Sequence, residues 1–296
     1  MYSILIATML RRIIHAFLAL FLTAPLFVNG QIDLPRISPN STIAQTIGLT
    51  DVEVSYSRPS KRGRQLLGEL IPYGQVWRLG ANESTKFRTS QVLLVNGDSL
   101  EAGTYALYAV PEEDAFQIIF HADTTVSGNE DENYDPQQIV LTVESPVYYE
   151  RFNVENFRID FQELQHDRAT MVIAWGEFRV ACELTVFTDA FVMKDIEKQI
   201  WTNPTAKTYY QSARYLQEQG KDQENALRYL DKAEIIGGPT LYIYRVRSLV
   251  LAQQNKFIEA IEAAEASKSL AQDEGNDEFV RLNRRSIRLW RKEIRN

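Results

Sequence analysis

The segment YSRPSKRGRQLLGELIPYGQVWRLGANESTKF, residues 56–87, lies between two strand-like runs of the chain and is punctuated by glycine and proline. A connection of 32 residues without regular secondary structure is uncommon inside a compact domain. Long surface connections of this kind often carry function, because a rigid scaffold can position their side chains. We therefore expect a binding or catalytic site in this segment.

The residues around this segment alternate between apolar and polar with a period near two, from residue 42 to residue 187. Val52, Val54 and Tyr56, for example, fall on one face of an expected strand. Further short runs are rich in β-branched and aromatic residues and are separated by turn signals such as Asn96-Gly97. Eight or nine mostly antiparallel strands without intervening helices predict an all-β sandwich, and an open barrel is the alternative.

The pattern becomes helical beyond Asp189. Residues 206–236 and 241–270 each have the pattern of two amphipathic helices joined by a polar turn. A period of 34 residues aligns the two stretches and pairs Ala226 with Ala260, Leu230 with Ala264, and Ala233 with Ser267. This period predicts a small all-α domain of tetratricopeptide-like helix pairs. Helix pairs of this type usually bind a protein partner in a concave groove, which is an argument by analogy of fold.

These patterns divide the chain into four parts. They are a signal peptide at residues 1–30, a β-sandwich domain at 31–188, a linker or helix at 189–204, and two helix pairs with a basic capping helix at 205–296. The signal peptide is indicated by Arg11 and Arg12, which precede an apolar stretch and a cleavage site near Gly30. We expect an exported protein whose translation starts at Met1 or at Met9.

The formal net charge of −7 is unevenly distributed along the chain. Residues 278–296 contain seven Lys or Arg and two Glu, a balance of +5, which leaves −12 for the rest. An acidic body argues against a nucleic-acid partner. We expect residues 278–296 to form a capping helix with a solvated arginine face, and contact with an anionic membrane surface is the alternative.

The chain contains no recognisable catalytic or cofactor motif. Residues 63–70 have the glycine spacing of a phosphate loop but lack its Lys and its Ser or Thr. His121 and His166 are 45 residues apart, and neither has a second His or Cys nearby in the sequence. Cys182 lies in a strand-like run and is expected to be a small buried apolar residue. We expect neither a metal nor a cofactor.

Charged and aromatic side chains are concentrated in residues 56–87. The candidate binding residues are Arg58, Arg64, Tyr73, Trp77, Arg78, Asn82 and Glu83. The guanidinium groups near Glu83 either form an ion-pair network that holds the loop on the sheet or form a receptor for carboxylate, phosphate or sulfate groups. Tyr73 and Trp77 either cover the edge of the core or offer a flat face to a sugar or another ring.

Residues 38–188 contain the blocks YSRP, GR, PYG, WRLGANE and AGTY, followed by the closing MVIAWGEFRVACEL. In these blocks the chain resembles a family of exported bacterial proteins called domain of unknown function 2911, whereas residues 123–153 depart from the family's pattern. The resemblance implies a β-rich envelope domain that is often fused to tetratricopeptide-type repeats. It also implies a periplasmic location, and it implies no activity.

Three hypotheses about function follow. In the first, the protein is a non-enzymatic periplasmic binding protein whose loop holds an anionic or carbohydrate ligand and whose helical repeats bind a protein partner. The loop's arginines would grip that ligand, Trp77 and Tyr73 would stack on it, and Asn82 and Glu83 would orient it. In the second, the protein is a hydrolase of envelope glycan or ester substrates with Glu83 as acid or base. In the third, the loop is purely architectural and the repeats carry the whole function.

Overall fold

The computed structural model describes residues 34–127 and 134–295 of the chain. The expected signal peptide, residues 1–30, lies outside the described residues. Residues 34–39 belong to a separate unit and contain no helix or strand. The fold described below is that of the residues from Asn40 onward.

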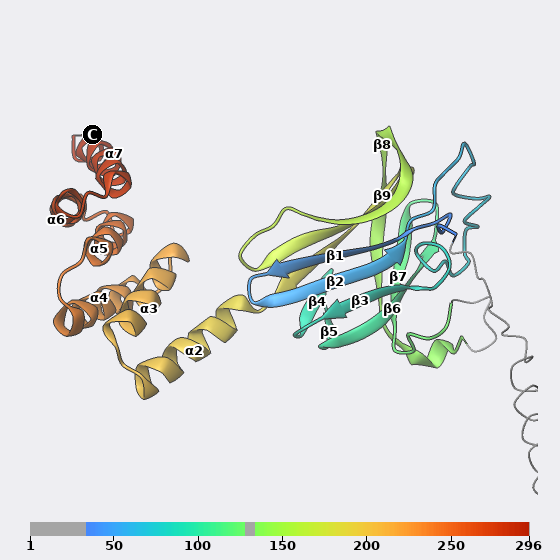
Figure 1. The fold of residues 1–296 in the computed structure, drawn as a ribbon, viewed down its shortest axis with the longest axis horizontal. Helices are drawn as coiled ribbons and strands as arrows, with labels where there is room; N and C mark the ends of the chain where they lie inside the picture. The colour runs from blue at the N-terminus through green and yellow to red at the C-terminus, as the bar shows by residue number, and fades with distance from the viewer. Residues whose placement is uncertain (1–33, 128–133, 296) are drawn as a thin grey trace, which may run out of the picture. The chain divides into compact units, whose positions relative to one another are not determined.

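Nine strands, all paired antiparallel, make up the first half of this part of the chain (Figure 1). Their bounds are β1 Asn40–Ile47, β2 Thr50–Ser57, β3 Thr85–Thr89, β4 Leu93–Val95, β5 Asp98–Leu100, β6 Gly103–Pro111, β7 Ala115–His121, β8 Ile139–Gln162 and β9 Arg168–Val186. They pair in the order β1-β2-β3-β6-β7-β8-β9-β4-β5. A short 3₁₀ helix, η1 Pro136–Gln138, precedes β8.

Strand β8 has 24 residues and belongs to both halves of the sheet. The part up to Pro146 pairs with β7, and the part from Val147 pairs with β9. The second pairing shifts its register on both sides of Val154, where several residues of β8 face fewer residues of β9. Such bulges bend a strand and increase its twist. The sheet can therefore turn over on itself within one strand.

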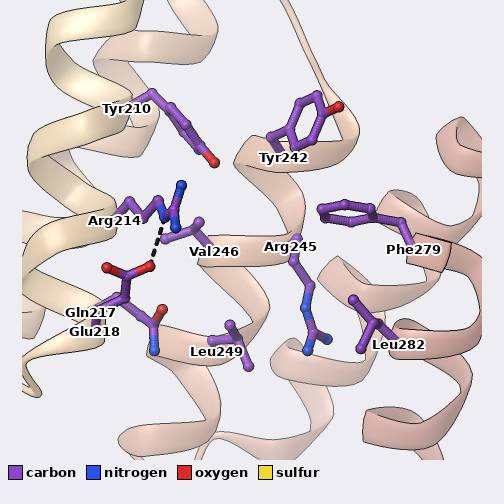
Figure 2. Close-up of a pocket in the computed structure, with 10 residues that line it drawn as sticks. All are labelled: Tyr210, Arg214, Gln217, Glu218, Tyr242, Arg245, Val246, Leu249, Phe279 and Leu282. Atoms are coloured by element: carbon purple, nitrogen blue, oxygen red, sulfur yellow. Dashed lines mark hydrogen bonds and ion pairs between the residues drawn. The ribbon is translucent and has the colours of Figure 1, made fainter. Parts of the chain in front are cut away.

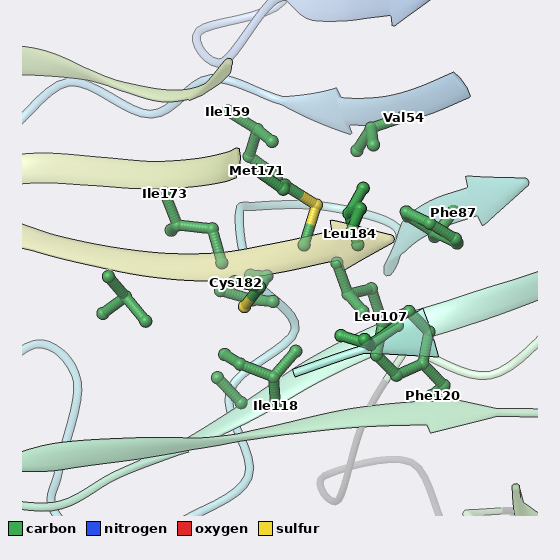
Figure 3. Close-up of a cluster of buried hydrophobic side chains, with 14 of the residues drawn as sticks. Val54, Phe87, Leu107, Ile118, Phe120, Ile159, Met171, Ile173, Cys182 and Leu184 are labelled. Atoms are coloured by element: carbon green, nitrogen blue, oxygen red, sulfur yellow. The ribbon is translucent and has the colours of Figure 1, made fainter. Parts of the chain in front are cut away.

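Apolar side chains from both halves of the sheet meet in one core, which Figure 3 shows in part. Val54, Phe87, Leu107, Ile118 and Phe120 come from β2, β3, β6 and β7, and Ile159, Met171, Ile173, Cys182 and Leu184 come from β8 and β9. The alternation seen in the sequence accounts for this arrangement, since every second residue of a strand points to the same face. The predicted all-β sandwich is confirmed.

Six helices follow in the described residues: α2 Thr188–Thr202, α3 Ala206–Glu218, α4 Gln223–Gly237, α5 Leu241–Gln253, α6 Phe257–Asp273 and α7 Asp277–Glu293. The start of α5 follows from local sequence, because Oγ1 of Thr240 accepts a hydrogen bond of 3.2 Å from the N–H of Ile243. Gly238, with a φ of 79°, stands just after α4 and is followed by Pro239, which cannot continue the helix. None of the helices in the described residues is both long and apolar enough to cross a membrane.

The helices pack as a repeat array in which α3 lies on α4, α5 on α6, and α6 on α7. All six residues that the 34-residue period aligns are fully buried: Ala226, Leu230, Ala233, Ala260, Ala264 and Ser267. Small side chains at these points let neighbouring helices approach closely. The predicted tetratricopeptide-like helix pairs are confirmed. In the last helix Val280 and Ile287 are buried, while contact of residues 278–296 with a membrane surface stays a prediction.

Candidate functional site

The connection between β2 and β3, residues 58–84, begins as an arm that pairs with the bent part of β8. The N–H of Lys61 donates to the carbonyl of Glu155 at 2.7 Å, and the N–H of Phe157 donates to the carbonyl of Pro59 at 2.9 Å. The side chain of Glu155 also accepts a hydrogen bond of 2.9 Å from the N–H of Arg62. The arm thus satisfies backbone groups that the bulge of β8 leaves without a partner on β9.

Tyr56 and Arg58, both in the YSRP block, hold the start of the loop on the sandwich. The hydroxyl of Tyr56 accepts a hydrogen bond of 3.0 Å from the N–H of Ile159 and donates one of 3.1 Å to the carbonyl of the same residue. Nε of Arg58 donates to the carbonyl of Phe157 at 3.0 Å. Both side chains are therefore engaged with the backbone of β8.

Trp77 packs at the edge of the core. Its ring stacks on Trp175 with centroids 6.1 Å apart and meets Phe157 edge to face at 5.3 Å. Its indole Nε1 donates to the carbonyl of Gly80 at 3.3 Å, and its backbone exchanges hydrogen bonds with Ala109 on β6. Of the two interpretations given for Trp77, this packing matches the one in which the ring covers the edge of the core.

Arg78, Asn82 and Glu83 lie at the end of the loop, beside the start of β3. Nη1 of Arg78 donates to the carbonyl of Asn82 at 2.8 Å. Nδ2 of Asn82 donates to Oγ of Ser57 at 3.3 Å, and the backbone of Asn82 is left-handed with a φ of 61°. Glu83 is exposed. Burial lowers the pKa of Lys86, and the nearby negative charges of Asp123 and Glu83 oppose this shift.

The other two predicted residues, Arg64 and Tyr73, line a hollow of about 420 Å³ in the β domain. Its lining is Lys61, Gly63, Arg64, Gln65, Leu66, Leu67 and Tyr73 from the loop, Tyr149 from β8, and Glu177 and Phe178 from β9. The guanidinium of Arg64 is oriented by the carbonyls of Lys61 at 3.0 Å and Ser60 at 2.6 Å. Within the described residues neither Arg64 nor Lys61 is paired with a carboxylate.

A glycine on β9 lets the loop pack closely against that strand at the hollow. Gly176 has a φ of 59°, and a Cβ at this position would stand 2.7 Å from Cδ1 of Leu66. Leu66 lines the hollow and is buried as part of the sandwich core. The seven predicted site residues therefore separate into two that line a hollow and five that lie outside its lining.

A second and larger hollow, of about 570 Å³, lies among α3, α5 and α7. We call it the helical groove (Figure 2). Its lining is Tyr210, Arg214, Gln217 and Glu218 from α3, Tyr242, Arg245, Val246 and Leu249 from α5, and Phe279 and Leu282 from α7. The residues from α5 are spaced by three, four and seven positions, so that they form one face of that helix.

Aromatic rings line one side of the helical groove. The ring centroids of Tyr210 and Tyr242 are 6.5 Å apart, and those of Tyr242 and Phe279 are 5.1 Å apart in an edge-to-face contact. Tyr242 is 43 % exposed, so that part of this aromatic surface is open to a ligand. Burial raises the pKa of Tyr210, against the opposite effect of Arg214, and its hydroxyl is neutral at physiological pH.

Two arginines of the helical groove differ in their partners. Nε of Arg214 lies 2.6 Å from a carboxylate oxygen of Glu218, one turn further along α3. Nη1 of Arg245 donates instead to Oδ1 of Asn283 at 3.2 Å and to Oγ of Ser286 at 3.0 Å. The repeat pattern predicts a protein partner for the helices, but the predicted site residues include none that line this groove. The spacing of the α5 residues was a usable signal, since it marks a helix face that is neither all apolar nor all charged.

The described residues contain no group of three or more His, Cys, Asp or Glu placed to hold a metal ion. His121 is buried, and its Nε2 lies 2.9 Å from the carbonyl of Asp135. The buried thiol of Cys182 lies 3.1 Å from Oγ of Ser145. These residues are accounted for by packing and hydrogen bonding inside the β domain.

The fold and the two hollows define a class of protein, a β-sandwich joined to a short array of helical repeats. Residues 38–184 match the family model described as "Protein of unknown function (DUF2911)", so the chain carries a domain of that family. No curated protein and no solved structure matches the chain.

Proposed function

We propose that this is an exported, periplasmic, non-enzymatic binding protein whose helical groove receives a segment of a partner protein. The observation that supports the proposal is the groove itself, in which an exposed aromatic ring, Tyr242, stands beside Arg245 on the face that α5 turns toward α3 and α7. Grooves between helices that combine apolar walls with a few fixed polar groups are common binding sites for peptides.

The β domain supplies a second binding surface in this proposal. Lys61 and Arg64 offer two cationic groups beside the phenol rings of Tyr73 and Tyr149, and this combination suits an anionic or carbohydrate ligand. A suitable probe pair is glucuronate and glucose, compared by ligand-observed NMR on the full-length chain. We expect the wild type to bind glucuronate and not glucose, and we expect Arg64→Gln to lose the glucuronate signal. Equal signals from both sugars would contradict the preference for an anionic ligand.

The alternative function, a hydrolase with Glu83 as acid or base, lacks a comparable supporting feature. Glu83 lines neither of the two hollows described above. A glycosidase pair would in addition need a second carboxyl group about 5 to 9.5 Å away. The binding proposal therefore has the stronger structural support.

Site-specific crosslinking in growing cells tests the proposal. A photoreactive phenylalanine analogue at Tyr242 is expected to form adducts with a partner protein, and the same analogue at Ile235 provides a matched control. Ile235 is 83 % exposed, belongs to α4 and lies outside the groove. Adducts of equal amount from both positions, or none from Tyr242, would reject the groove as the binding surface.

Export is tested on the same cells by fractionation and by sequencing the N-terminus of the protein. Cleavage after Gly30 would leave Gln31 as the first residue. A protein that keeps residues 1–30 would contradict a cleaved signal peptide.

A further inference from the structure

One cation of the helical groove has no anionic partner in the described protein. Arg245 is half-buried, and the only hydrogen bonds of its guanidinium in the described residues go to the neutral side chains of Asn283 and Ser286. Arg214, in the same groove, is by contrast neutralised by Glu218. A positive charge that is partly removed from water without a counter-charge attracts a carboxylate more strongly than an exposed one does.

A chain of buried polar groups fixes the position of this charge. Oγ of Ser267 donates to the carbonyl of Leu241 at 2.7 Å, and Nδ2 of Asn283 donates to Oγ of Ser267 at 2.8 Å. Because Nδ2 is used in this way, Oδ1 of Asn283 is directed to Arg245 as an acceptor. Ser267 and Asn283 are both fully buried, so the chain holds the guanidinium without neutralising it.

The free edge of the guanidinium has the geometry that a carboxylate requires. Both protein hydrogen bonds use Nη1, which leaves Nε and Nη2 without a hydrogen bond to the described residues. Neither atom is among the buried side-chain atoms that lack a partner, so both remain open to solvent. These two atoms form the edge through which arginine binds a carboxylate by two parallel hydrogen bonds. Burial lowers the pKa of Arg245, but the guanidinium stays protonated at neutral pH.

Apolar side chains flank Arg245 on both sides along α5. Tyr242 precedes it by one turn and Leu249 follows it by one turn, and in Figure 2 the side chain of Arg245 extends away from Tyr242, so that its guanidinium is drawn between Leu249 and Leu282. The seven positions from Tyr242 to Leu249 span about 10 Å at the rise of an α-helix, which is the length of about three extended residues. A ligand chain can therefore continue past Arg245 in both directions, which favours an internal side chain over a terminal carboxylate.

We propose that the helical groove recognises an extended segment of the partner in which an Asp or Glu side chain lies between two apolar or aromatic residues. The carboxylate accepts hydrogen bonds from Nε and Nη2 of Arg245, and the flanking side chains pack on Tyr242 and Phe279 at one end and on Leu249 and Leu282 at the other. This inference rests on the function proposed above. It adds the chemistry of the ligand and the residue that selects it.

A displayed library of random heptapeptides, selected on the full-length chain, tests the proposal. The wild type is expected to enrich Asp or Glu flanked by apolar residues. Arg245→Gln is expected to lose the acidic preference and keep the apolar one, and Arg245→Lys to keep the acidic preference with weaker binding. Arg284→Gln removes the same charge from an exposed position of α7 outside the groove and serves as the control.

Synthetic forms of a selected peptide complete the test. They are measured first on the wild-type protein, so that this result does not depend on the folding of a variant. Replacement of its acidic residue by the amide is expected to weaken binding about ten- to a hundred-fold, as the loss of a charged hydrogen bond implies. The same replacement should have no effect on Arg245→Gln, and amidation of the peptide's C-terminus should have no effect on either protein.

The outcomes separate this inference from the function on which it rests. Acidic enrichment that persists in Arg245→Gln, or binding that depends on the peptide's C-terminal carboxylate, would overturn the inference and leave the groove as a peptide site. If the selection yields no peptide, or only peptides whose binding is not weakened by Leu282→Arg, the proposed function itself is rejected.

Discussion

Tyr56 shows that a residue beside a candidate loop can serve to stabilise the fold. Its hydroxyl satisfies both backbone groups of Ile159, which is itself buried, and so fixes β8 to β2 at the point where the loop begins. The sequence placed Tyr56 on the inner face of its strand by alternation alone. It could not show the hydrogen bonds, because their partner lies 103 residues further along the chain.

Replacement of Tyr56 by phenylalanine tests this assignment. The change keeps the ring but leaves the N–H and the carbonyl of Ile159 without a partner, and about 1 to 3 kcal/mol of stability should be lost. Urea denaturation measures the loss. Tyr148→Phe is the control, since Tyr148 is 54 % exposed and its change should stay within about 0.5 kcal/mol. Equal effects of the two substitutions would contradict a role for the Tyr56 hydroxyl.

Cys182 gives a second prediction at this scale. Burial raises the pKa of its thiol to about 11, against a smaller opposite effect of the hydrogen bond with Ser145. The thiol is therefore uncharged at neutral pH and inaccessible, and the folded protein should not react with Ellman's reagent. The denatured protein should release one equivalent. Stoichiometric reaction of the folded protein would show that the core around Cys182 opens readily.

At the scale of elements, Asp189 joins the β domain to the helices. It lies in the first turn of α2 and accepts hydrogen bonds from the hydroxyl of Tyr215 on α3 and from Nζ of Lys221. Nε2 of His166, in the connection between β8 and β9, lies 3.1 Å from the same carboxylate. Burial alone would raise the pKa of Asp189, but these partners together lower it to about 2.

The low pKa of Asp189 gives a pH-dependent prediction. A carboxyl group whose pKa is lower in the folded state stabilises the fold above its unfolded pKa, near 4, and loses this effect as the pH falls through about 2. Because the side chain is about a third exposed, the stabilisation should be about 1 kcal/mol after allowance for solvent screening.

Urea titrations of the wild type and Asp189→Asn from pH 7 to pH 2 measure this effect. The difference in stability between the two proteins should be constant above about pH 5 and should shrink toward zero near pH 2. A difference that stays constant throughout would show that the charge of Asp189 contributes nothing.

The strands show where sequence reasoning reaches its limit. The runs QQIVLTV and FRIDF look like separate strands because the interval between them, residues 144–156, contains Pro146 and several charged residues, yet both lie in β8 apart from the first two residues of QQIVLTV. Alternation reports the strand period but not whether such an interval is a turn or a bulge. The lining of the β-domain hollow was predicted only in part for a related reason, since Arg64 and Tyr73 were named but the side chains from β8 and β9 were not. Tyr149 and Phe178, which complete its lining, lie on strands far from the loop in sequence.

The helical repeats were more predictable, because their signal is local. The small residues at positions 226 and 260 fall at the same place in consecutive units, and helices packed in sequence order keep such a period. The groove's polar chain was not predictable in the same way. It depends on Ser267 and Asn283 meeting across α6 and α7, where the sequence offers only a serine and an asparagine among many.

At the scale of the whole molecule, the β domain and the helices have separate hydrophobic cores. The residues of the sandwich core come from the strands and the long loop, and a second core is formed only by residues of the helices. Two cores without shared members favour two unfolding transitions over one.

Denaturation followed by two probes tests this separation. Of the four tryptophans, Trp77 and Trp175 pack in the sandwich, Trp201 is 88 % exposed and Trp290 is partly buried on α7, so the fluorescence of a Trp290→Phe variant should follow mainly the β domain. Circular dichroism at 222 nm should follow mainly the helices. We expect the two transitions to differ in midpoint, and a chain that ends at residue 187 to keep the fluorescence transition of the full-length protein. Coincident transitions, or loss of the fluorescence transition on truncation, would indicate a single cooperative unit.

The strand shared by both halves of the sandwich limits how this domain can change in length. A one-residue insertion in the paired parts of β8 would shift its register against β7 or β9 and turn its side chains to the opposite face. Residues 150–153 have no paired partner on β9, so additions there alter only the size of the bulge. Length variation among descendants of this chain should therefore collect in those four positions, while the flanking segments of the strand keep their spacing.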